Sequence, residues 1–137
     1  MISQKEISID WINKVSKENR SADKILVEKV IRALLLLEGL VKEKQPFVFK
    51  GGTALMLHLN STKRLSIDID IILPDAPKNL EDILDVLAKE QGFIRKELQH
   101  RNTTSKIKTE HYKFFYTPFI NQTKRRNTYC SIFYLKK

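Results

Sequence analysis

The sequence predicts an α/β (α+β) domain in which helices flank a mixed β-sheet. A long stretch near the N-terminus has the 3.6-residue period of an amphipathic helix. The stretch "SIDIDIIL" alternates polar and aliphatic residues as a strand does, and the last third holds three segments rich in β-branched and aromatic residues. Because 137 residues suffice for one core, we expect a single domain over residues 1–137.

Residues 1–45 are expected to form two helices. Within residues 1–20, apolar side chains recur every three or four positions, at Ile7, Trp11, Ile12 and Val15. The next helix should run from Ala22 to about Lys44, with Ser21 as its N-cap. Pro46 then ends the helical region.

Residues 46–73 are expected to contain two strands around a short helix. "PFVFK" is a short apolar strand that runs directly into "GGT". "TALMLHL" predicts a short buried helix with Thr53 near its start and His58 packed inside. After a polar loop comes the strand that carries Asp68 and Asp70, which "PDAPKN" closes.

Residues 74–137 are expected to hold one helix and a basic, β-rich part. Asn79 should cap a helix that runs to about Gln91, and Gly92 should end it. The strands "GFIRKELQ", "HYKFFYT" and "TYCSIFYL" follow, joined by polar basic loops. We expect most of their aromatic residues, and Cys130, to lie in the core.

The positive charge of the chain is concentrated in its C-terminal third. The formal net charge is +9, and the residues from Arg101 to Lys137 hold nine Lys and Arg against the single acid Glu110. Such a concentration indicates a polyanionic partner, nucleic acid first, although a solvated surface would also account for it.

Other features of the sequence argue against a secreted, membrane-spanning, disulfide-bonded or zinc-binding protein. The start of the sequence has no signal-peptide pattern and no apolar run is long enough to span a membrane, so we expect a cytoplasmic protein without a membrane partner. A single cysteine cannot form an internal disulfide. Three scattered histidines argue against a zinc site.

Two aspartates in an otherwise aliphatic strand carry the candidate chemistry. Asp68 and Asp70 project from one side of the strand, about 6–7 Å apart along it, and repel each other. A divalent cation would offset this repulsion, since Mg²⁺ takes one or two carboxylates together with phosphate oxygens. Gly51 and Gly52, between a strand and a helix start, would let backbone N–H groups approach a phosphate chain. The alternative is an edge strand whose aspartates face water or pair with Arg64 or Lys63.

The segment "FKGGTAL" followed by "RLSIDID" resembles the signature of the AbiEii/AbiGii toxin family of minimal nucleotidyltransferases. This family is a branch of the DNA polymerase β-like nucleotidyltransferase superfamily. The resemblance covers residues 21–73 well and the remainder weakly. It implies a nucleotidyltransferase-like mixed sheet and transfer of a nucleotidyl group from an NTP to an RNA, for example a tRNA, or to another acceptor hydroxyl.

The resemblance also implies roles for individual residues. Asp68 and Asp70 would be catalytic and would coordinate Mg²⁺ or Mn²⁺. The nucleotide-binding positions would be Lys50, Gly51, Gly52, Thr53, Arg64 and Ser66. The RNA acceptor would use the basic C-terminal third, and a cognate antitoxin is an expected protein partner.

The sequence departs from the superfamily pattern in two ways. A third carboxylate is expected on a later strand beside the first two, and Ser131 occupies that place. Family members also extend into a further helical region with its own Lys/Arg/Asp motif, so we expect a short or truncated member. One alternative is therefore a catalytically degenerate nucleotide- or RNA-binding remnant of the same fold. Another is a basic RNA-binding protein with structural aspartates.

Overall fold

The computed structural model describes residues 7–61, 63, 65–75, 77–99, 109–119 and 129–136. Its helices are α1 (Ile9–Glu18), α2 (Lys24–Lys42), α3 (Gly51–His58) and α4 (Leu80–Glu90). Its strands are β1 (Val48–Lys50), β2 (Asp68–Leu73), β3 (Arg95–Gln99), β4 (Thr109–Phe115) and β5 (Tyr129–Lys136). The predicted α/β architecture is confirmed, and every predicted strand is present.

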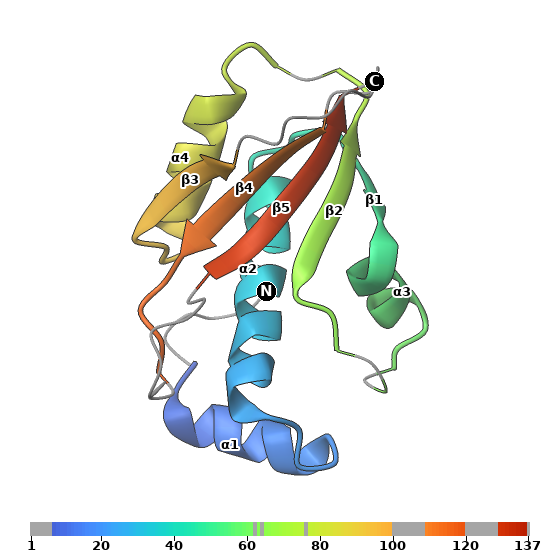
Figure 1. Cartoon of the computed structure of the whole chain (residues 1–137), viewed down its shortest axis with the longest axis vertical. Coiled ribbons are helices and arrows are strands. Elements are labelled where there is room, and N and C mark those ends of the chain that lie inside the picture. Colours follow the sequence, from blue (N-terminus) through green and yellow to red (C-terminus); the bar gives the residue numbers. More distant parts are fainter. Residues whose placement is uncertain are drawn as a thin grey trace.

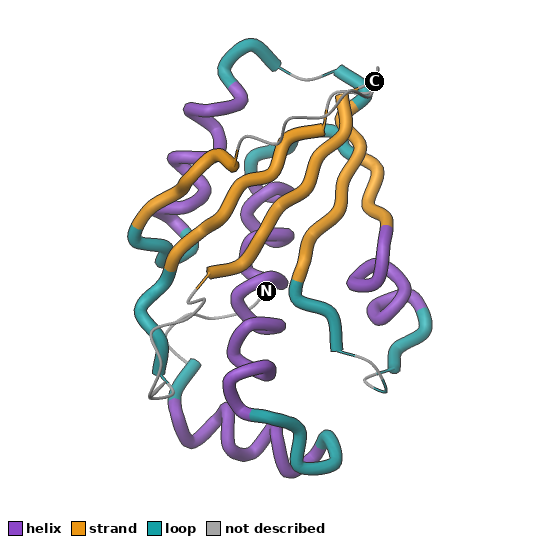
Figure 2. Tube along the Cα trace, viewed as in Figure 1, coloured by secondary structure: helices purple, strands orange, loops and turns teal. Residues whose placement is uncertain are grey.

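The five strands form one mixed sheet in the order β1-β2-β5-β4-β3. β2 and β5 are parallel, and the other neighbouring pairs are antiparallel. In Figure 1, α2 and α4 lie behind the sheet, α1 crosses the lower end of α2, and α3 lies beyond the β1 edge. Figure 2 shows the same two layers, so one sheet face is covered by helices and no described helix covers the other.

The core fills the space between the sheet and its helices. Alternate residues of the central strands point into it, among them Ile69 and Ile71 of β2. α2 and α4 pack so closely that a Cβ atom on Gly39 would lie 2.7 Å from Leu87 Cγ. Cys130 is buried in this core, as predicted. A smaller cluster joins α1 to α2 around the fully buried Ile12.

The start of α2 differs from the prediction. Asp23, not Ser21, is the N-cap, and its Oδ1 accepts hydrogen bonds from the N–H groups of Ile25 and Leu26. Ser21 instead has a positive φ of 54° in the turn between α1 and α2. Several good capping residues stand close together here, and the turn decides among them.

α3 is the second correction, because it is not a buried helix. Thr53 and Met56 are buried, but Leu55, Leu57 and Leu59 are 59%, 46% and 66% exposed. His58, expected to be packed, is exposed as well. A helix that is apolar on all sides usually lies inside a protein. Within the described residues, its main contacts are with the edge strand β1 and the neighbouring strand β2.

The aromatic residues divide between core and surface. Phe114 and Tyr134 are buried as predicted, whereas Trp11 and Phe119 are 36% and 39% exposed. The predicted basic loops fall almost entirely on residues 100–108 and 120–128, outside the described residues. Among the helices that are described, none has the length and hydropathy needed to cross a membrane.

Candidate active site

The two carboxylates lie on the uncovered face of an internal strand. β2 is hydrogen-bonded to β1 on one side and to β5 on the other, which rules out the edge-strand interpretation. Asp68 and Asp70 are half-buried, while Ile69 is fully buried on the opposite face. In the described part of the chain, no salt bridge joins either aspartate to a basic side chain.

The glycine turn packs directly against this pair. Gly51 has φ +83°, in the left-handed region that favours glycine, and a Cβ atom there would lie 2.4 Å from Asp70 Oδ2. A Cβ atom on Gly52 would lie 3.1 Å from Ser66 Oγ. No side chain caps the start of α3. The first N–H groups of this helix therefore begin beside Asp70 without a side-chain acceptor.

Thr53 connects the glycine turn to the aspartate strand. Its side chain is fully buried, and its Oγ1 lies 2.6 Å from the carbonyl oxygen of Asp68 and 2.9 Å from Ser66 Oγ. A carbonyl oxygen only accepts, so Thr53 donates its one proton to Asp68 and accepts the proton of Ser66. The Thr53 side chain thus fixes the start of α3 to the start of β2 and does not line the cavity.

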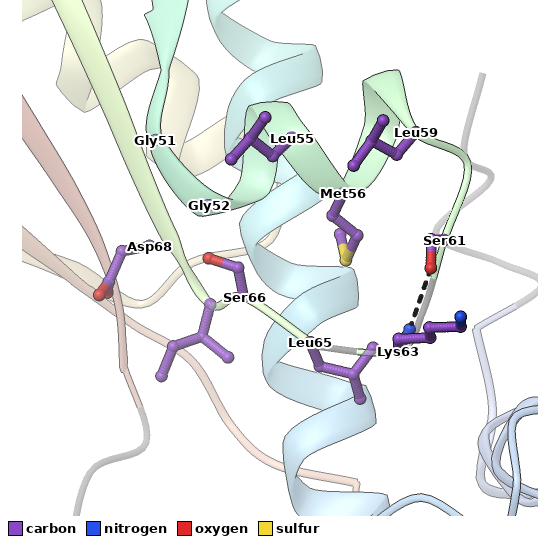
Figure 3. Close-up of a pocket in the computed structure, with 11 residues that line it drawn as sticks. Gly51, Gly52, Leu55, Met56, Leu59, Ser61, Lys63, Leu65, Ser66 and Asp68 are labelled. Atoms are coloured by element: carbon purple, nitrogen blue, oxygen red, sulfur yellow. Dashed lines mark hydrogen bonds between the residues drawn. The ribbon is translucent and has the colours of Figure 1, made fainter.

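A cavity of about 800 Å³ opens beside these residues. Figure 3 shows Asp68 and Ser66 toward one end and Leu59, Ser61 and Lys63 toward the other. The wall between these ends is mostly apolar. Its side chains come from α3 and from the segment before β2: Leu55, Met56, Leu65 and Ile67. The cavity therefore has a polar end with a carboxylate and a mainly apolar remainder.

Burial raises the pKa of the Asp68 carboxyl above its usual value, and the negative charge of Asp70 raises it further. The ammonium group of Lys29 partly opposes these two effects. Lys29 belongs to α2, and its carbonyl oxygen accepts a hydrogen bond from the thiol of Cys130, the residue before Ser131. Lys29 was not among the predicted site residues, because nothing in the local sequence links a helix lysine to a distant strand.

The donor set fits a divalent cation of the Mg²⁺ type. Asp68 and Asp70 supply hard oxygen ligands on one face, and their mutual repulsion is the kind of charge arrangement that a cation relieves. No group of three or more His, Cys, Asp or Glu residues that could hold a metal ion occurs in the described ranges. Such a site would therefore rely on oxygen atoms of a bound phosphate as well.

The remaining predicted residues have different places. Lys50 is exposed and lies directly opposite Asp70 in the β1–β2 pair. Arg64 lies outside the described residues. Ser131 is 3% exposed and lies directly opposite Asp68 in the parallel β2–β5 pair, in agreement with the place inferred for it from the sequence.

One family of known proteins matches this chain. Residues 35–131 match the family described as "Nucleotidyl transferase AbiEii toxin, Type IV TA system". The chain belongs to the AbiEii family. The match includes the glycine turn, both aspartates and Ser131, and the family is one of nucleotidyltransferase toxins of type IV toxin–antitoxin systems, which implies a cognate antitoxin. Neither the curated proteins nor the solved structures include a match to the chain.

Proposed function

We propose that this AbiEii-family chain is a divalent-metal-dependent nucleotidyltransferase that transfers a nucleotidyl group from an NTP to a hydroxyl group of an RNA. The observation that carries the proposal is the contact between the glycine turn and the aspartate strand. Gly51 lies so close to Asp70 that no larger residue fits. A phosphate chain held by the start of α3 would therefore lie against the two carboxylates.

Each part of the site has a role in this reaction. The N–H groups at the start of α3, including those of Gly51 and Gly52, bind phosphate oxygens of the NTP. Asp68 and Asp70 hold the metal ion, which when bound neutralises phosphate charge and orients the α-phosphate. Thr53 keeps the turn and the carboxylates at a fixed separation. The acceptor hydroxyl forms the new bond to the α-phosphorus, and pyrophosphate and a proton leave.

RNA is the acceptor that the charge of the chain favours. A formal net charge of +9 attracts a polyanion, and eight of these charges belong to residues 101–137. The proposed protein partner is the cognate antitoxin. The proposed compartment is the cytoplasm.

A second candidate function rests on Ser131. This residue lies opposite Asp68, where the superfamily pattern leads us to expect a third carboxylate. A hydroxyl group is a weaker ligand for a second metal ion and a poor base. The alternative is a catalytically degenerate domain that binds NTP or RNA without turnover.

A transfer assay separates these two functions. The protein is incubated with Mg²⁺, an RNA pool and each NTP in turn, labelled in the α-phosphate, and RNA-bound label is measured. We expect label transfer by the wild type and a loss of about 100-fold or more in Asp70→Asn. Asp75→Asn, which changes an exposed aspartate beyond β2, is the matched control and should keep full activity. Binding of NTP without transfer to any acceptor would support the degenerate alternative.

A further inference from the structure

The uncovered sheet face carries a second feature at the β3 side of the aspartates. The guanidinium carbon of Arg95 lies 3.7 Å from the ring centre of Phe115. The rings of Phe115 and Tyr129 are 5.5 Å apart and tilted by 54°, and Lys113 Nζ lies 4.4 Å from the centre of the Tyr129 ring. We call Arg95, Phe115, Tyr129 and Lys113 the aromatic–basic ladder.

The pairing register places this ladder next to the candidate active site. Arg95, Phe115 and Tyr129 lie directly opposite one another across β3, β4 and β5. The next row on the same face runs from Lys113 through Ser131 to Asp68. Tyr129 is therefore one strand across and two residues along from Asp68, which is about 8 Å between backbones at standard sheet spacings.

The exposure and charge of the ladder fit a nucleic acid. Arg95 is exposed, and Phe115, Tyr129 and Lys113 are half-buried although no described helix covers this face. Arg95 pairs with Glu97 at 3.0 Å, while no salt bridge within the described ranges holds Lys113. A guanidinium stacked on a ring keeps N–H groups in its own plane for phosphates. Aromatic rings beside basic groups are the combination that binds single strands through base stacking and phosphate contacts.

We propose that the aromatic–basic ladder binds the single-stranded, hydroxyl-bearing end of the RNA acceptor. This inference rests on the proposed function and adds where the acceptor lies. Bases next to the terminal nucleotide stack on Phe115 and Tyr129, and Arg95 and Lys113 contact their phosphates. The strand end then points from Tyr129 toward Asp68, which lies in the neighbouring row.

The test is fluorescence anisotropy with a labelled single-stranded RNA and the full chain, in the absence of NTP and Mg²⁺. Phe115→Leu and Tyr129→Leu should each raise the Kd about fivefold or more, and Tyr129→Phe should keep wild-type affinity because it retains the ring. Phe119→Leu is the matched control, since Phe119 also stacks on an arginine, Arg32, but does not belong to the sheet. Its Kd should not change.

Two variants that each remove one positive charge complete the test. Lys113→Gln should lower the slope of log Kd against log salt by about 1, whereas Lys14→Gln, on the exposed side of α1, should leave this slope within error of the wild type. Thermal melting of each variant verifies that it is folded.

Two results would overturn the inference. One is RNA binding by the wild type that none of the ladder variants weakens more than the controls do. The other is the absence of RNA binding by the wild type. The first result leaves Mg²⁺-dependent NTP binding and label transfer to RNA intact, so the ladder alone fails. The second result also removes RNA as the acceptor, and the transfer assay then shows whether the proposed function fails with it.

Discussion

The two faces of the sheet differ in how their carboxylates are paired. On the helix-covered face, polar groups are bonded to one another: the Tyr112 hydroxyl donates to Glu81 Oε1 at 2.5 Å, and the Tyr134 hydroxyl donates to Glu110. On the uncovered face, Asp68 and Asp70 lie side by side with no salt bridge in the described part of the chain. These carboxylates on the first face already accept hydrogen bonds from protein groups. On the uncovered face, the two carboxylates repel each other, and a bound cation would reduce this repulsion.

The largest expected difference between the two faces concerns neighbouring residues of β2. Ile71→Ala removes a side chain that is 2% exposed on the covered face, and should lower the free energy of unfolding by about 2–5 kcal/mol. The Mg²⁺-dependent NTP affinity of the folded protein should not change. Urea denaturation and calorimetric NTP titration measure the two quantities. A loss of NTP affinity as large as that in Asp70→Asn would break the distinction between the faces.

Two glycines extend the comparison. Gly51→Ala would force an alanine to φ +83° and its Cβ against Asp70, so NTP binding should disappear, with a stability loss of about 1–2 kcal/mol. Gly39→Ala would overpack the contact with Leu87 on the covered face. It should lower stability by about 1–3 kcal/mol, partly offset by better helix propensity, and leave NTP binding intact. Equal NTP binding by the two variants would show that the glycine turn beside Asp70 does not form the nucleotide site.

Thr53 joins the two layers of the site, and its hydroxyl can be tested alone. Thr53→Val keeps the shape but leaves the Asp68 carbonyl and Ser66 without this partner, at a cost of about 1–3 kcal/mol in stability. NTP affinity should fall because the start of α3 is no longer fixed to β2. Thr53→Ser retains the hydroxyl and should recover both properties. Equal NTP affinity in the valine and serine variants would show that this hydroxyl does not position the site.

The smallest effects concern pH and have opposite signs on the two faces. Burial raises the pKa of Glu81, but hydrogen bonds from Lys96 and Tyr112 outweigh it and hold the pKa below its usual value. The ionised Glu81 carboxylate therefore stabilises the fold at pH values above the pKa that it has in the unfolded chain. This contribution is lost as the pH falls through its lower pKa in the folded protein. The pKa of Asp68 is raised, by burial and then by Asp70, so its carboxylate destabilises the fold as pH rises.

Thermal melting from pH 3 to pH 7 without divalent cations should show both effects. Asp68→Asn should be more stable than the wild type at neutral pH and should lose that advantage in acid. Glu81→Gln should be less stable at neutral pH, with the difference closing in acid. Both groups are partly exposed, so each effect should amount to a few tenths of a kcal/mol. The same pH dependence in both variants would contradict the opposite directions given for the pKa shifts of Asp68 and Glu81.

Local sequence patterns were sufficient for most elements. The alternation of Asp68, Ile69, Asp70 and Ile71 predicted the faces of β2 correctly because strand geometry has a period of two. The glycine turn and the carboxylates were also predictable, since they stand close together in the sequence. The two errors arose where tertiary context decides. Asp23, and not the predicted Ser21, caps α2 because of the conformation of the preceding turn. The helix predicted to be buried, α3, lies at the sheet edge, and Leu59 at its end is exposed.

Long-range pairing was the part that the sequence could not provide. Nothing local indicates that Arg95, Phe115 and Tyr129 form one row, because that row depends on the strand order. Lys29 near Asp68 is a second case, since it comes from a helix packed on the sheet. The sequence did predict a place for Ser131 beside the aspartates, from the polar position in an otherwise apolar strand.

Metal-dependent nucleotide binding by the uncovered face is measured by calorimetric titration of NTP into the purified chain with and without Mg²⁺. We expect the wild type and Asp75→Asn to bind NTP only when Mg²⁺ is present, and Asp68→Asn and Asp70→Asn not to bind it. Binding of NTP that is independent of Mg²⁺, or that survives in both β2 variants, would contradict the claim that the uncovered face holds the metal and the nucleotide.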